Sequence, residues 1–234
     1  MRSDLATMNA LLRGLAETNG AANTTPSVRS ASLFASVGHE TSNQDMPPLR
    51  RVDIGRILGS RKSSFDFANS GVSAANVTAM VQDALLTDSQ LWNLNHTAGV
   101  LEAFVFAFKS DDWPTGIYRV TSATVSCVGN LSAVGPLENL GVQREFVSGA
   151  GIVTLYAPLD QADHWAGAHG YRISALRASM ALYDFHLQTL EAGWTGSVFG
   201  GFIPSVVRHI LKSDGVTRHP LLAAAYGLPA SDPA

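Results

Sequence analysis

Two short segments of this 234-residue chain have residue types and spacing suited to binding a ligand. Arg61 and Ser63 stand in the polar run SRKSSFDF, where a guanidinium and a hydroxyl can both donate hydrogen bonds to a phosphate group. Gly200 and Gly201 end the run AGWTGSVFGGF, where glycine lets backbone N–H groups approach a flat or anionic ligand closely. A solvated turn would also explain the first segment, and a helix end followed by a turn would explain the earlier glycines of the second.

Histidine is the side chain most easily poised for proton transfer near neutral pH, and His164 and His169 lie close together ahead of a long helical pattern. No carboxylate joins them at a recognisable ligand spacing, so the sequence predicts no metal site. Cys127 is the single cysteine, and it stands in a strand-like run where a buried, inert thiol is the default.

Composition excludes several classes of protein. The chain is 46% hydrophobic and 15% charged, which suits one sizeable core, and its formal net charge of −3 argues against binding to nucleic acid. No apolar run approaches the roughly 20 residues needed to cross a bilayer, and the first residues lack a secretory pattern. We therefore expect a cytoplasmic protein with no membrane or nucleic-acid partner.

The pattern along the chain predicts two regions. Residues 1–48 read as an N-terminal amphipathic helix and a flexible linker, and residues 49–234 as one compact domain. In this domain we predict helices over 52–58, from an N-cap at Ser73, and from Tyr171 to Ala192. The long helix is marked by helical spacing of Leu176, Met180, Tyr183, Leu187 and Leu190. Between the last two helices lie the strand candidates EAFVFAF, GIYRV, ATVSCV and GIVTLYAPL, and a strand LLAAAYGLP follows a glycine loop and a short helix. This order predicts an α+β fold with a mixed central sheet packed by helices.

The order of several motifs resembles the nitroreductase superfamily, and within it the azoline dehydrogenases, which are flavin enzymes that oxidise thiazoline and oxazoline rings in ribosomally made peptides. The resemblance covers roughly Ile54 to Pro229. The matching motifs are RKS at 61–63, TAG at 97–99, GYR at 170–172, GGF at 200–202 and a terminal YGLP.

The resemblance implies a nitroreductase-like fold, an intertwined dimer and an FMN cofactor. Arg61 and Ser63 would hold the FMN phosphate and ribityl chain, and the backbone beside Gly200 would contact the redox-active nitrogen. The full set of cofactor-binding residues so implied is Arg61, Ser63, Thr97, Gly99, Arg172, Gly200 and Gly201.

Departures from the family are as informative as the matches. The family commonly has a Lys-Tyr pair to which removal of the ring proton is attributed. In this sequence Trp165 and Ala166 stand in its place. The replacement bases that we predict are His164, His169 and Tyr171. Two expected basic residues near the phosphate are also absent, since Phe65 and Leu228 stand in their places. The cations that could replace them are Arg172, Arg208, Lys212 and Arg218.

Three functions are consistent with these residues. The first is an FMN-dependent dehydrogenase acting on azoline rings of a modified peptide in natural-product biosynthesis, as a homodimer or within a heteromeric biosynthetic complex. The second keeps the flavin and reduces a nitro, quinone or ene compound with NAD(P)H, which the missing Lys-Tyr pair favours. The third is a degenerate, non-catalytic partner subunit, which the substitutions at Phe65, Trp165, Ala166 and Leu228 favour.

Overall fold

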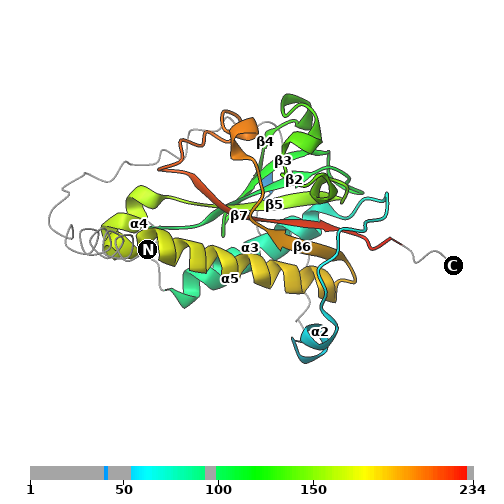
Figure 1. Cartoon of the computed structure of the whole chain (residues 1–234), viewed down its shortest axis with the longest axis horizontal. Helices are drawn as coiled ribbons and strands as arrows, with labels where there is room; N and C mark the ends of the chain where they lie inside the picture. Colours follow the sequence, from blue (N-terminus) through cyan, green and yellow to red (C-terminus); the bar gives the residue numbers. More distant parts are fainter. Residues whose placement is uncertain (1–39, 42–53, 93–98, 231–234) are drawn as a thin grey trace, which may run out of the picture.

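The computed structural model describes residues 40–41, 54–92 and 99–230 of the chain. These form one α+β unit in which a sheet separates two long helices from a layer of short helices (Figure 1). The predicted N-terminal helix lies outside the described residues, so the domain boundary at 48/49 stays a prediction. A two-residue strand, β1 (Glu40–Thr41), lies within the segment predicted as linker and pairs with strand β4.

The sheet has seven strands in the order β1-β4-β3-β2-β5-β7-β6. All the predicted strands are confirmed: β2 (Glu102–Ala107), β3 (Gly116–Val120), β4 (Val125–Gly129), β5 (Gly151–Ala157) and β7 (His219–Gly227). A further strand, β6 (Thr195–Phe199), lies where the sequence analysis predicted a glycine loop. Each described ladder is antiparallel, which corrects the prediction of a mixed sheet. Hairpin connections from β2 through β4 explain this, because neighbouring strands joined by short turns must run in opposite directions.

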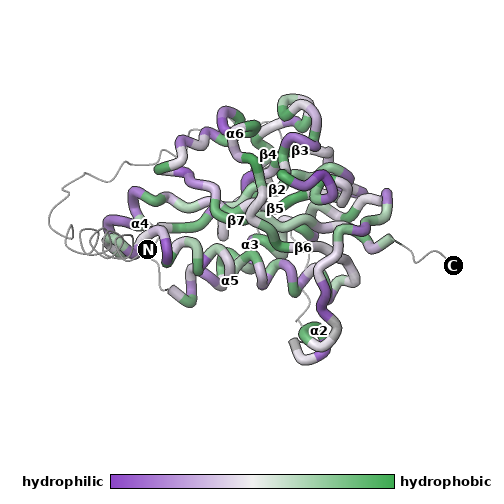
Figure 2. Tube along the Cα trace, viewed as in Figure 1, coloured by the Kyte–Doolittle hydropathy of each residue, from purple (hydrophilic) through white to green (hydrophobic). Residues whose placement is uncertain are grey.

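Alternate residues of the central strands enter two separate cores. Ala103 and Val105 of β2 pack toward the long helices, whereas Phe104 and Phe106 pack on the other face with Phe146. Both sets are fully buried, and Figure 2 shows hydrophobic residues concentrated in the strands. The sheet is therefore covered on both sides, which is why its inner strands lack a polar face.

Helices α3 (Ala74–Leu91) and α5 (Gly170–Glu191) cover one face of the sheet. The predicted N-cap of α3 is confirmed, because the Ser73 side chain accepts a hydrogen bond from the Asn76 amide at 3.0 Å. Helix α2 (Ile54–Ser60) packs near the end of α5. Helix α4 (Leu159–Ala166), which the sequence analysis missed, precedes α5 in the chain. On the opposite face lie α6 (Pro204–Val207) and the 3₁₀ turns η3 (Leu131–Ala133), η4 (Leu137–Asn139) and η5 (Arg144–Val147).

The apolar residues whose spacing predicted α5 lie only partly on its buried face. Leu176 and Met180 are 51% and 44% exposed, and Tyr183 is exposed as well. The buried face holds smaller residues such as Ala178 and Ala181, which allow α5 to lie close to α3. Large apolar side chains are thus left on the outer surface of the helix.

The predicted glycine loop after α5 is mostly a strand. Residues Thr195–Phe199 form β6, and Gly196 pairs with Tyr226 of β7. A Cβ on Gly196 would lie 2.1 Å from the Ala225 carbonyl oxygen, so a glycine is needed here for close strand approach. The loop proper is reduced to Gly200 and the residues just after it. No helix of the described residues is long and apolar enough to span a membrane.

Candidate functional site

The segment that carries Arg61 and Ser63 wraps around the free edge of β6. Before it, Ile57 of α2 is buried and Arg56 forms an ion pair with Glu191 at the end of α5. After it, the Ser64 amide donates a hydrogen bond to the Gly196 carbonyl of β6 at 3.0 Å. The segment is therefore fixed at both ends, while Arg61 and Ser63 themselves are exposed.

An aromatic cluster links this segment to the predicted glycine pair. The Phe65 ring meets Phe146 edge-on at 5.1 Å, and Phe146 stacks on Phe199 at 3.6 Å between ring centroids. Gly201 follows Phe199 closely, and a Cβ built on it would lie 3.9 Å from the Phe146 ring. A Cβ built on Gly200 would meet no atom within 4 Å. The structure thus places Phe65, two residues after Ser63, in an aromatic cluster that also borders Gly201, and the neighbouring Gly200 has open space beside it.

His186 of α5 is a site residue that the sequence analysis missed. The side chain is only 2% exposed, and its Nε2 has no hydrogen-bond partner. Burial, and then the positive charge of Arg61, lower the pKa of this imidazole below its ordinary value. A buried ring nitrogen without a hydrogen-bond partner destabilises the folded protein, so a ligand group that pairs with Nε2 would remove this cost. No local sequence pattern could have indicated it, because the arrangement depends on how α2 packs against α5.

These features fit a phosphorylated, flat cofactor such as FMN. Arg61 offers a donor fork to a phosphate, and the unpartnered Nε2 of His186 offers a second polar atom nearby. Phe65 and Val142 expose apolar surface beside the open edge of Gly200. A group that carries both an anion and an aromatic ring would meet each of these features.

Gly99 lies beside Arg177 of α5, and both of its backbone polar groups are hydrogen-bonded within the fold. Its N–H donates to Gln161 at 3.0 Å, and its carbonyl accepts from Arg177 Nη1 at 2.6 Å. Arg177 is 0% exposed and also forms a bidentate pair with Asp88 at 3.1 and 2.6 Å. This arginine thus joins α3 to α5 and fixes Gly99, the last residue of the TAG motif at 97–99. Thr97 of that motif lies outside the described residues.

The predicted bases gather at the other end of α5. His164 lies on α4, His169 in the turn η6 (Gly167–His169), and Tyr171 in the first turn of α5; all three are exposed. Arg172 is exposed beside them. Twenty residues of helix separate Tyr171 from Glu191, a rise of about 30 Å. One chain alone therefore does not bring these residues to the Arg61 segment.

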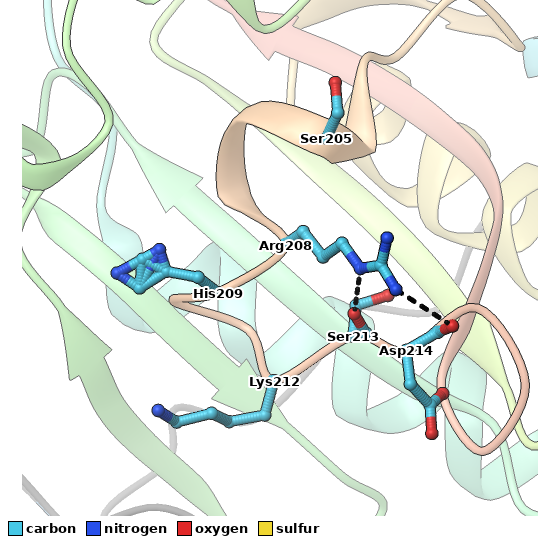
Figure 3. A pocket seen from close by; sticks show the side chains of 6 residues that line it. All are labelled: Ser205, Arg208, His209, Lys212, Ser213 and Asp214. Atoms are coloured by element: carbon cyan, nitrogen blue, oxygen red, sulfur yellow. Dashed lines mark hydrogen bonds between the residues drawn. The ribbon is translucent and has the colours of Figure 1, made fainter.

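The candidate replacement cations also lie away from Arg61. Arg218 is buried in a hydrogen-bonded ion pair with Glu102 and donates to the Leu211 carbonyl at 2.9 Å. Arg208 donates to the Ser213 carbonyl at 3.0 Å, as Figure 3 shows. The loop that carries them precedes the start of β7, whereas Gly196 beside Ser64 pairs near the end of that strand. The cations missing at Phe65 and Leu228 are not replaced by these residues.

No family model matches the sequence, and no curated protein matches it. Solved structures do match. A candidate nitroreductase of Anabaena variabilis aligns with a TM-score of 0.62 at 15% identity over 76% of this chain, although the alignment spans only 38% of that protein. The Escherichia coli microcin synthetase complex McbBCD with truncated pro-MccB17 bound contains a chain that aligns with a TM-score of 0.58 at 15% identity, over 94% of this chain and 82% of that one.

A third solved structure contains a bound flavin. It is a candidate nitroreductase of Exiguobacterium sibiricum in complex with FMN, aligned with a TM-score of 0.53 at 10% identity, over 79% of this chain and 91% of that one. These likenesses show that the chain has the nitroreductase fold, and the expected fold class is confirmed. The identities are too low to transfer an activity, so the function must be argued from the site.

Proposed function

We propose that this protein is an FMN-dependent oxidoreductase whose cofactor lies along the Arg61 segment and the Gly200 edge. The observation that carries the proposal is the position of one exposed segment: Arg61 lies near the buried, unpartnered imidazole of His186, and Phe65 of the same segment contacts the aromatic cluster beside the open glycine turn. Residues 61–65, 186 and 200 are far apart in the sequence, so nothing local to the sequence requires this arrangement.

Each residue has a distinct role in holding the cofactor. Arg61 and Ser63 bind the phosphate, and His186 donates or accepts a hydrogen bond at the buried side of the same group. The backbone at Gly200 and Gly201 lies at the edge of the ring. When bound, FMN supplies the two-electron redox chemistry, and the protein supplies its orientation and electrostatic environment.

We further propose that the substrate is an azoline ring or a related site in a modified peptide. Support comes from the motif order of the sequence and from the fold shared with a chain of the microcin synthetase complex, which aligns over 94% of this protein. In this reaction the ring loses one proton and one hydride and becomes an aromatic azole. The proton acceptors that we propose are His164, His169 and Tyr171.

A dimer is needed to bring these bases to the cofactor. Within one chain they lie on the helix side of the sheet near the start of α5, whereas Gly201 packs with Phe146 on the opposite side. The exposed apolar residues of α3 and α5 offer a surface for a second copy. They are Leu86, Leu91, Leu176, Met180 and Tyr183. We propose that a second copy, or a related subunit of a biosynthetic complex, completes the site.

The substrate assignment is tested by incubating the FMN-loaded protein with a thiazoline-containing peptide in air. We expect the peptide to lose two hydrogen atoms, measured by mass spectrometry, while protein without FMN leaves it unchanged. An intact peptide combined with rapid flavin bleaching by NADPH would instead support the NAD(P)H-dependent reductase. An intact peptide together with a flavin that NADPH does not bleach would support the third function, a non-catalytic partner subunit. The exposed positions of the predicted bases favour this function.

A further inference from the structure

A second charged cavity lies on the face of the sheet opposite α5, away from the Arg61 segment. Its volume is about 520 Å³, and its lining residues are Ser205, Arg208, His209, Lys212, Ser213 and Asp214. Figure 3 shows His209 and Lys212 extending on one side of the loop, with the Arg208 guanidinium lying over Ser213 and Asp214. A volume of this size is typical of a small-molecule site.

The loop that forms the cavity is held in place by hydrogen bonds to its backbone. Arg208 Nε donates to the Ser213 carbonyl at 3.0 Å, and the Ser213 amide donates back to the Arg208 carbonyl at 2.9 Å. Below them, the buried Arg218 donates to the carbonyls of Leu211 and Lys212 at 2.9 and 3.2 Å. The cavity wall is therefore fixed before any ligand arrives, which reduces the entropic cost of binding.

The backbone at Lys212 is in an unfavourable conformation. Its φ angle of 50° is the only positive φ among the described residues other than glycine. This region is sterically strained for an L-amino acid with a side chain, so the position would suit glycine or asparagine better. The lysine is nevertheless present, and its side chain extends to the same side of the loop as that of His209 (Figure 3).

Within the described part of the chain, the cationic side chains of the cavity form no ion pair, although one carboxylate of the lining offsets part of their charge. Among the described residues, no ion pair includes Arg208, His209 or Lys212. Asp214 is the one carboxylate of the lining, and its oxygens accept hydrogen bonds from the amides of Val216 and Thr217 at 2.8 Å each and from the Thr217 hydroxyl at 2.8 Å. Burial alone would raise the pKa of Asp214, but these bonds lower it to about 2. The carboxylate is thus committed to its own loop.

We propose that this cavity binds the phosphate group of a small phosphorylated molecule, with Lys212 as its cationic contact and His209 as a further hydrogen-bond contact on the same side of the loop. A phosphate has several acceptor oxygens and up to two negative charges, which match donors from more than one lining side chain. The cavity is much larger than phosphate itself, which leaves room for an organic group attached to it. This site does not depend on the cofactor proposal, because none of its residues belongs to the Arg61 neighbourhood.

The test uses the full chain saturated with FMN, or as purified if it takes up none, so that a cofactor site cannot compete for phosphate. Ribose 5-phosphate and inorganic phosphate are titrated separately at constant ionic strength set with sodium chloride, and the His209 imidazole resonances are followed by NMR. We expect a saturable shift with both probes. Tighter binding of ribose 5-phosphate assigns the cavity to an organic phosphate, and equal affinity assigns it to the free ion.

Lys212→Gly is the main variant, because glycine accepts the positive φ while the ammonium is removed. We expect binding to weaken about tenfold, as for the loss of one charge-assisted hydrogen bond. His209→Gln is the second variant, and its phosphate binding is measured by the increase in thermal stability that phosphate causes. Arg144→Gln is the control: it removes an exposed cation on η5, and we expect it to leave binding unchanged. Shifts that do not saturate, or that are the same in Lys212→Gly as in the parent, would overturn the proposal.

Discussion

Arg177 is part of the long helix α5 and Arg61 lies near that helix, yet their surroundings differ. Arg177 is completely buried, and its three donor nitrogens are taken up by Asp88 and the Gly99 carbonyl. Arg61 is exposed and lies near His186, whose buried Nε2 has no partner. A fully paired buried arginine holds a fold together, whereas an exposed, unpaired arginine is available to bind an anion, which is the role that we propose for Arg61.

Removal of the paired arginine should have the largest effect on stability. Arg177→Met leaves the Asp88 carboxylate buried without its partner, and we expect the free energy of unfolding to fall by about 3–5 kcal/mol. Urea denaturation measures the loss. Arg144→Met removes an exposed arginine and should change stability by no more than about 0.5 kcal/mol. Equal effects of the two variants would contradict the structural role of Arg177.

Removal of the unpaired arginine should change binding and leave stability alone. Arg61→Gln loses charge-assisted hydrogen bonds to the phosphate, so we expect FMN affinity to fall at least tenfold, corresponding to about 1.5–3 kcal/mol. Quenching of flavin fluorescence on titration measures this. Lys62→Gln removes the neighbouring exposed charge and should have a smaller effect. A large loss of stability in Arg61→Gln would place Arg61 in the same class as Arg177.

His186 should make the protein without FMN sensitive to acid. Its pKa is lowered in the folded state, so the unfolded chain binds more protons as the pH falls below the ordinary histidine value of about 6.5. The free energy of unfolding should therefore decrease from pH 7 toward pH 5. His186→Leu removes the titrating group, and its stability should fall less over this range. Parallel pH profiles for the two proteins would show that His186 does not titrate in this way.

Phe65 should give the smallest effect. Phe65→Arg restores the cation expected from the family resemblance and loses the edge contact with Phe146, which is worth about 0.5–1.5 kcal/mol of unfolding free energy. FMN affinity should rise a few-fold because a second cation then lies on the phosphate-binding segment. Phe65→Leu is the matched control, with the same lost contact and no gain in affinity.

Much of the fold could be predicted because its signals are local. The apolar runs of β2 and β5, the Ser73 cap and the turn glycines each determine their own element. The prediction of a mixed sheet was wrong because the direction of a strand depends on how it is connected to its neighbours. The prediction of a glycine loop was wrong because Gly196 allows close approach to a partner strand that lies far along the chain.

The candidate site was only half predictable. Arg61 and Gly200 carry recognisable residue types, so the sequence predicts them as site residues, and their role stays a prediction. His186 lies near Arg61 because α2 packs against α5, which no short pattern encodes. Gly99 was assigned to the cofactor, whereas the structure commits both of its backbone groups to Arg177 and Gln161. Long-range packing thus decided which candidates meet.

The central claim is that the Arg61 and Gly200 neighbourhood binds FMN. The most direct measurement is the visible absorbance of the natively purified protein, followed by release of the chromophore by heat and its identification. We predict a yellow protein with close to one FMN per chain, and loss of that colour in Arg61→Gln under the same purification. A colourless protein that takes up no added FMN would contradict the account.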